Sequence, residues 1–208
     1  MKIINDKALS TNREIPFAFF KNEKPSNSLA IILPGIGYTT QAPLLHYSRS
    51  IFLNKGYDVL QVNYRYIPET FFSMSGEEFT SDVQSVIEKI FINNSYSNYA
   101  IIAKSIGTIA LSYLLDKPIF KSATAIWLTP LLKRTEVFNA LLNSSNKGLC
   151  IIGDKDPIHV PEKFEEIKSN NNINRMLIEG VNHNLEDDTD LIKSLAVLKE
   201  VMLKIKEF

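Results

Sequence analysis

The sequence has a single cysteine and no long apolar run, and each shortage excludes a class of protein. With one cysteine, Cys150, the chain cannot form an internal disulfide, which excludes the disulfide-rich secreted scaffolds. No segment approaches the roughly 18 consecutive apolar residues of a membrane-spanning helix, and the first residues lack the apolar stretch of a signal peptide. We therefore expect a cytoplasmic protein that has no membrane partner.

An excess of charge of either sign is lacking as well. The 23 lysine and arginine residues are balanced by 23 aspartate and glutamate residues. Because binding to a phosphate backbone needs a basic surface, this balance argues against nucleic acid as the main partner. Hydrophobic residues make up 45% of the chain, which is usual for a folded globular protein, and the length favours one domain over residues 1–208. The oligomeric state is left open.

Short apolar runs alternate with longer helical patterns along most of the chain. Two weak strands at residues 2–9 and 15–20, separated by polar residues, predict an antiparallel hairpin. Further apolar runs bounded by turn residues predict strands that are buried on both faces, and stretches with helical spacing of apolar residues lie between them. We expect strands at 29–33, 57–64, 99–103, 123–128, 149–152 and 175–178, and helices at 43–55, 77–92, 106–115, 131–142, 160–168 and 188–206. This alternation predicts an α/β fold with a mostly parallel sheet and helices on both faces.

Residues that can carry chemistry directly follow three of the predicted strands. Ser105 stands between a strand and a helix in the segment Ala103-Lys104-Ser105-Ile106-Gly107. Asp154 and Asp156 follow a later strand, and His183 follows the last one. In a parallel sheet the ligand site lies at the carboxyl ends of the strands, so we expect these side chains to share one edge of the sheet.

These segments resemble the α/β-hydrolase family. The serine segment is similar to the nucleophile elbow G-x-S-x-G, with Ala103 in place of the first glycine, and the chain order serine, aspartate, histidine is that of the family. The family's acid typically stands in a G-x-x-D turn, which selects Asp156 and leaves Asp154 as the fallback. The resemblance therefore implies Ser105 as nucleophile, His183 as base and Asp156 as the acid that orients the base.

The chain has two other histidines. His46 lies within the predicted helix at 43–55, where a structural role is favoured. His159 follows Asp156 in the same loop, but it precedes the last strand, which is the wrong place for the family's base. With His183 as base, activity is expected to fall below roughly pH 6 to 7, because a protonated histidine cannot accept the proton of Ser105.

The resemblance also implies an oxyanion hole made of two backbone N–H groups. One belongs to Ile106, directly after the nucleophile. The segment Pro34-Gly35-Ile36-Gly37-Tyr38 resembles the family's H-G-x-G oxyanion loop, with Pro34 in place of the histidine. By that match Ile36 donates the second N–H.

The family often inserts a lid between the strands predicted here at 123–128 and 149–152, but in this sequence only one helix fits between them. The resemblance therefore implies an open site without a large lid, and a serine esterase that cleaves a small ester or related acyl substrate without a cofactor. Tyr38, Tyr64 and Leu131 are expected to line the pocket. The stretch 67–76, rich in aromatic residues, is either a loop packed onto the core or a wall of that pocket.

The sequence offers less support for other functions. The segment Gly35-Ile36-Gly37 resembles half of a dinucleotide-binding fingerprint, but the third glycine is missing and the next strand offers no acidic residue for a ribose. A non-catalytic ligand-binding protein on the same fold is the main alternative, because a fold does not determine a function. An acyltransferase or thioesterase would use the same three residues. Apart from His183, no group of histidine, cysteine and carboxylate residues has the spacing of metal ligands, so we expect no metal.

Overall fold

The computed structural model describes residues 1–11 and 13–208, whose strands form one sheet in the order β1-β2-β4-β3-β5-β6-β7-β8. The strands are β1 (Lys2–Leu9), β2 (Glu14–Lys21), β3 (Ser28–Leu33), β4 (Asp58–Val62), β5 (Asn98–Lys104), β6 (Thr124–Leu128), β7 (Gly148–Gly153) and β8 (Ile173–Ile178). β1 and β2 form an antiparallel hairpin, β2 is antiparallel to β4, and all pairs from β4 to β8 are parallel. The predicted α/β sheet with an N-terminal hairpin is confirmed.

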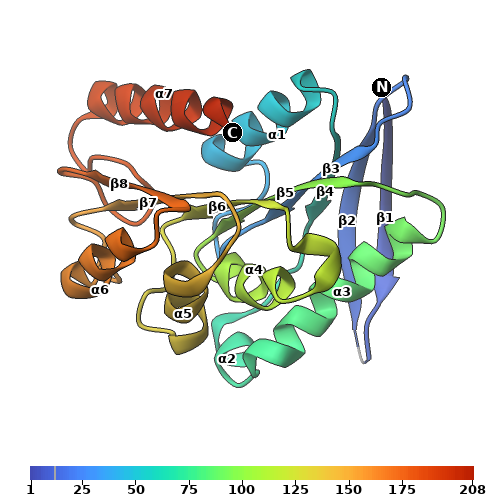
Figure 1. The fold of residues 1–208 in the computed structure, drawn as a ribbon, viewed down its shortest axis with the longest axis horizontal. Coiled ribbons are helices and arrows are strands. Elements are labelled where there is room, and N and C mark those ends of the chain that lie inside the picture. The colour runs from blue at the N-terminus through green and yellow to red at the C-terminus, as the bar shows by residue number, and fades with distance from the viewer. Residues whose placement is uncertain (12) are drawn as a thin grey trace.

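Helices cover both faces of this sheet (Figure 1). The longer ones are α1 (Pro43–Asn54), α3 (Gly76–Phe91), α4 (Gly107–Leu115), α5 (Thr135–Asn143) and α7 (Leu191–Glu207), and the short ones are α2 (Pro68–Phe72) and α6 (Pro161–Glu166). α1 and α7 lie on one face, whereas α3, α4, α5 and α6 lie on the other. In the part of the chain that the structure describes, no helix combines the length and apolar character needed to cross a membrane.

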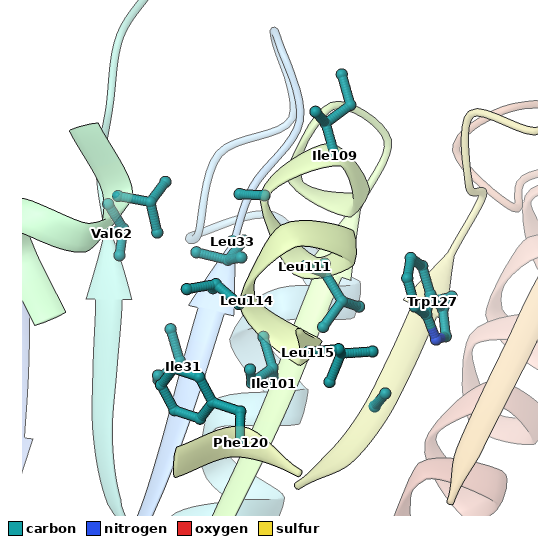
Figure 2. Close-up of a cluster of buried hydrophobic side chains, with 14 of the residues drawn as sticks. Ile31, Leu33, Val62, Ile101, Ile109, Leu111, Leu114, Leu115, Phe120 and Trp127 are labelled. Atoms are coloured by element: carbon teal, nitrogen blue, oxygen red, sulfur yellow. The ribbon is translucent and has the colours of Figure 1, made fainter. Parts of the chain in front are cut away.

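The core under α4 follows directly from the apolar runs in the sequence. Alternate residues of β3 point to opposite faces, so that Ile31 and Leu33 join the core on the α4 side. Figure 2 shows side chains of α4, including Leu111 and Leu114, above these strand residues, with Trp127 of β6 beside them. Each of these side chains is fully buried, and burial of one such group stabilises the fold by about 1.5–3 kcal/mol.

Several helix boundaries differ from the predicted ones. The stretch 67–76 was predicted without a helix, but it contains α2, which begins at Pro68. The helix predicted at 131–142 begins only at Thr135, because residues 131–134 form a tight turn. The helix predicted at 188–206 begins at Leu191, because the Asp190 side chain accepts the Lys193 N–H and caps it. The stretch predicted as one helix at 160–168 divides into α6 and a 3₁₀ turn.

The α2 segment packs onto the core through one of its two phenylalanines. Phe71 is buried and meets the ring of Phe79 edge-on, with ring centroids 5.3 Å apart, whereas Phe72 is 78% exposed. Phe71 also contacts the ring of Tyr66. This anchoring explains why a short, proline-initiated helix forms in a stretch that has no helical spacing of apolar residues.

Candidate active site

Ser105 occupies a tight left-handed turn between β5 and α4. Its φ is +51°, a region that residues other than glycine rarely adopt, and its N–H donates to the carbonyl of Leu128 at 3.0 Å. Such a conformation costs about 1–3 kcal/mol and persists only where the surrounding structure holds it in place. The strain is typical of a nucleophile elbow, which lifts the serine hydroxyl clear of the sheet.

Small neighbours make this turn possible. A Cβ atom on Gly107 would lie 2.6 Å from the carbonyl oxygen of Leu33, which is closer than real atoms approach. A Cβ on Gly35 would lie 3.2 Å from the Cβ of Ser105. Ala103 fits in place of the family's glycine as a fully buried residue. The requirement for small residues around Ser105 therefore has a direct steric cause.

The three residues predicted to act together lie in one hydrogen-bonded chain. The Nε2 atom of His183 lies 2.9 Å from Ser105 Oγ, and its Nδ1 lies 2.7 Å from Asp156 Oδ2. The Asp156 side chain is fully buried and also accepts the N–H of Ile158 at 2.9 Å, whereas the His183 side chain is 32% exposed. A buried, hydrogen-bonded carboxylate next to Nδ1 favours the tautomer in which Nε2 faces the serine as an acceptor.

The rival residues are engaged elsewhere. Asp154 accepts the backbone N–H of Gly180 at 2.6 Å. The His46 ring contacts Arg49 on α1, and the His159 ring lies edge-on to Phe164. Among the described residues, His159 Nε2 is buried and has no hydrogen-bond partner. None of these groups takes part in the Ser105–His183–Asp156 chain.

The turn that carries His183 is held by hydrogen bonds of its own. The side-chain oxygen of Asn182 accepts the N–H groups of Asn184 and Glu186, at 2.8 and 3.3 Å, and the Asn182 N–H donates to the Glu186 carbonyl at 2.9 Å. Leu185 has a φ of +60° and is buried, which anchors the end of the turn. These contacts fix the backbone on which the imidazole is mounted.

Sequence reasoning missed one residue of this region. Lys104, directly before Ser105, is fully buried and donates to the hydroxyl of Thr129 at 2.8 Å and to the carbonyl of His183 at 2.7 Å. Burial lowers the pKa of Lys104 to about 7, against the opposing effect of the nearby carboxylates of Asp156 and Glu186. The signal available in the sequence was a lysine at the end of an otherwise apolar strand.

Ile36 and Ile106, the predicted oxyanion-hole residues, line the same cavity of about 560 Å³. Within the described residues, neither backbone N–H donates to another protein group. Gly37 has a φ of +74°, and the Gly35 N–H donates to the Tyr38 carbonyl at 3.2 Å, so the loop forms a tight turn. Backbone N–H groups without a protein partner are available to bind an oxyanion.

The three predicted pocket residues lie on three different cavities. Tyr64 lines the cavity that Ile36 and Ile106 share, and its hydroxyl donates to the Pro34 carbonyl. Tyr38 lies on a separate cavity of about 430 Å³, and its hydroxyl accepts the Leu44 N–H at 3.1 Å. Leu131 lines a small cavity of about 70 Å³ beside α2. Of the three, only Tyr64 lines the cavity that Ile36 and Ile106 share.

The remaining polar chemistry of the chain is limited. Cys150 is fully buried in β7, and burial raises the pKa of its thiol to about 12. Over residues 1–11 and 13–208, no three histidine, cysteine or carboxylate side chains are grouped so as to hold a metal ion.

Comparison with known proteins identifies the fold. No family model matches the chain, and no curated protein matches it in sequence. The chain is similar in structure to ATU1826 of Agrobacterium tumefaciens, a protein of unknown function assigned to the α/β hydrolases, with a TM-score of 0.75 at 19% identity over 98% of this chain and 94% of that one. It is also similar to the esterase Pf2001 of Pyrococcus furiosus, with a TM-score of 0.73 at 15% identity over 99% and 91% of the two chains.

A third similar structure is XC6422 of Xanthomonas campestris, a serine hydrolase without a lid, with a TM-score of 0.69 at 13% identity over 99% of this chain and 94% of that one. In the present chain, residues 129–147 connect β6 to β7 and contain the nine-residue helix α5. The sheet order, the strained turn after β5 and the match over nearly the whole length agree with one another. We conclude that this chain has the fold of the α/β hydrolases.

Proposed function

We propose that this protein is a serine hydrolase that cleaves a small ester or a related acyl substrate through an acyl-enzyme intermediate. The observation that carries the proposal is the unbroken chain of hydrogen bonds from Ser105 Oγ through the His183 imidazole to the buried Asp156 carboxylate. Nucleophile, base and orienting acid at these distances are the arrangement that activates a serine.

In the first half of the reaction, Ser105 Oγ attacks the acyl carbonyl carbon and His183 Nε2 takes its proton. The 2.9 Å separation of these atoms allows direct transfer. The Asp156 carboxylate stabilises the imidazolium that forms, because it accepts the Nδ1–H at 2.7 Å and is itself buried. The imidazolium then gives its proton to the leaving group.

The negative charge that develops on the carbonyl oxygen needs preorganised donors. The N–H groups of Ile36 and Ile106 serve this role, because both residues line one cavity and Ile106 directly follows Ser105 at the start of α4. The N-terminal end of a helix favours negative charge there. In the second half of the reaction, His183 activates a water molecule that releases the acid from Ser105.

The shape of the site supports a small substrate. The cavity beside the proposed oxyanion hole has a volume of about 560 Å³ and is bounded by the oxyanion loop, β1, β2 and the segment after β4. Its lining mixes apolar groups such as Phe17 and Tyr64 with polar groups such as Asn63 and Arg65. Since α5 alone joins β6 to β7, the opening is not covered by a separate lid domain, which favours a compact acyl group over a long lipid chain.

A panel of p-nitrophenyl esters from acetate to decanoate, with an acyl thioester alongside, tests the proposal. We expect the purified protein to hydrolyse the short esters fastest, and Ser105→Ala to reduce the rate by about 10⁴-fold or more. Ser112→Ala is the matched control, because Ser112 is a buried serine on α4 whose hydroxyl donates to the Ile109 carbonyl. Turnover that Ser105→Ala does not change would contradict the proposal, and faster thioester cleavage would redirect it to a thioesterase.

A further inference from the structure

A charged side chain lies buried directly beneath the proposed active site. Lys104 ends β5, and none of its surface is exposed. Lysine is almost never fully buried unless it is paired, because removing an ammonium group from water is costly. No step of the proposed reaction uses Lys104, so its burial calls for another explanation.

The contacts of Lys104 join segments that are far apart in the sequence. Its Nζ donates to the hydroxyl of Thr129, which follows β6, and to the carbonyl of His183, which follows β8. The same Nζ lies 4.7 Å from the centroid of the Tyr38 ring, in the oxyanion loop. An ammonium group has three N–H donors, and here two oxygen atoms and an aromatic face surround it.

The charges around Lys104 come from two loops. Asp156, after β7, and Glu186, in the turn after His183, both favour the ammonium form of Lys104. Asp156 is at the same time the carboxylate that accepts from His183 Nδ1. The Lys104 side chain therefore interacts with a buried carboxylate of the site, and its hydrogen bond reaches the backbone of the base.

We infer that Lys104 is a positioning residue of this active site, whose side-chain nitrogen fixes the His183 backbone and the Tyr38 ring relative to Ser105. The inference rests on the proposed function of Ser105 and His183. Lys104 is covalently joined to Ser105, so a hydrogen bond from its side chain to the His183 carbonyl links the backbone of the nucleophile to the backbone of the base. Without it, the turn that carries His183 loses its direct link to β5.

The primary test compares Lys104→Met with Lys163→Met in steady-state hydrolysis of p-nitrophenyl acetate. Lys163 is the matched control, because its Nζ also donates to a carbonyl, that of Leu132 at 3.0 Å, and also lies 4.7 Å from an aromatic ring, that of Phe138. We expect kcat to fall about 10- to 100-fold in Lys104→Met with KM within twofold of the wild type, because small misplacements of a catalytic group reduce the rate by such factors. Lys163→Met should keep the wild-type kcat.

Thr129→Val provides a second variant in case Lys104→Met does not fold. Valine has nearly the shape of threonine but removes the acceptor of one Lys104 hydrogen bond, and we expect kcat to fall about 2- to 10-fold. A kcat unchanged in a folded Lys104→Met, or in Thr129→Val when Lys104→Met is unfolded, would overturn the inference. A fall of equal size in Lys163→Met would do the same, since it would reveal a general effect of losing a lysine.

Labelling with a fluorophosphonate separates failure of this inference from failure of the proposed function. If the wild type is labelled at Ser105 and Lys104→Met is labelled equally fast, only the positioning role is wrong. If the folded wild type is not labelled, the proposed function itself is wrong, and the inference falls with it. Slower labelling of Lys104→Met than of the wild type and Lys163→Met supports both.

Discussion

The carboxyl edge of the sheet and the core beneath α4 differ in backbone conformation and in the side chains that they bury. In the core, side chains such as Leu111 and Trp127 are apolar, fully buried and held in regular strands and helices (Figure 2). Along the edge, the described residues other than glycine that have a positive φ are Ser105, Thr129 and Leu185. They follow β5, β6 and β8, the strands that surround the proposed active site.

Buried charge is less sharply divided, because Asp58, at the start of β4, and Asp82, on α3, are also buried and accept tyrosine hydroxyls. Lys104 and Asp156 are buried at the carboxyl edge, whereas the core beneath α4 is formed by hydrophobic side chains. Strained backbone and buried charge each reduce stability, and natural proteins keep them mainly where function requires them. The two regions should therefore respond differently to substitution. Substitutions at the carboxyl edge should mainly change the reaction rate, and substitutions in the core should mainly change the free energy of unfolding.

The sharpest way to break the comparison is a pair of substitutions at neighbouring carboxylates on the edge. Asp156→Asn should lower kcat by about 10³- to 10⁴-fold, because the amide no longer stabilises the imidazolium and can select the wrong tautomer of His183. Asp154→Asn should stay close to the wild type, since an amide oxygen can still accept the Gly180 N–H. Steady-state ester hydrolysis measures both, and equal effects would remove the distinction between the two residues.

A substitution in the core should produce the opposite pattern. Leu111→Ala should reduce the free energy of unfolding by about 2–5 kcal/mol, because removing most of a fully buried side chain leaves a cavity in the core. Below its lowered unfolding temperature, the variant should still react with a fluorophosphonate at nearly the wild-type rate. Urea unfolding and the labelling rate check the two halves, and a loss of labelling without a loss of stability would contradict the division.

The buried charge at the edge should be visible in the pH dependence of stability. Lys104 has a pKa of about 7 in the folded protein, and an unfolded lysine has about 10.4. Between these values the unfolded chain holds a proton that the folded chain has released, so this group makes the free energy of unfolding rise with pH, by at most about 1.4 kcal/mol per pH unit. Below pH 7 both states are protonated and the contribution is constant.

Urea unfolding of the wild type and Lys104→Met at several pH values isolates this effect. The difference in free energy of unfolding, wild type minus variant, should increase from pH 7 towards pH 10. Tyrosine and cysteine titrations occur in both proteins and cancel in the difference. A flat difference would mean that Lys104 keeps an ordinary pKa in the folded state.

The smallest expected effect is at Cys150. Because its thiol is fully buried and its pKa is raised to about 12, native protein should not react with iodoacetamide at pH 8. Unfolding in urea should expose one reactive thiol, which intact mass detects as a single adduct. Rapid modification of the native protein would show that the region around β7 opens readily.

Local patterns were enough to predict the sheet and the three residues of the hydrogen-bonded chain. Turn residues stand at the ends of the parallel strands, and Ser105, Asp156 and His183 lie in the segments that follow three of those strands. Lys104 was not predicted as part of the site, because its partners lie 25 and 79 residues away and its role depends on the folded arrangement. From the sequence alone, a lysine at the end of an apolar run is expected to be exposed to water at the end of a strand.

The predicted pocket residues lie apart, whereas the residues of the hydrogen-bonded chain lie together. Tyr38, Tyr64 and Leu131 each follow a strand, but the loops carry them to separate cavities. The direction of a side chain within a loop depends on long-range packing, as the Tyr38 ring shows by lying 4.7 Å from Lys104 Nζ. Likewise α2 is held by the contact of Phe71 with Phe79, and the local spacing of apolar residues does not predict this contact.

Intact mass after incubation with a fluorophosphonate tests the central claim most directly, because the reagent reports an activated serine whatever the natural substrate is. The account predicts one adduct on the wild type, mapped to Ser105, and no adduct on folded Ser105→Ala or His183→Ala, with Ser112→Ala labelled like the wild type. A folded wild-type protein that stays unlabelled would contradict the account and favour a ligand-binding protein on the same fold. An adduct that survives in Ser105→Ala would also contradict it, because a residue other than Ser105 would then be the one that reacts.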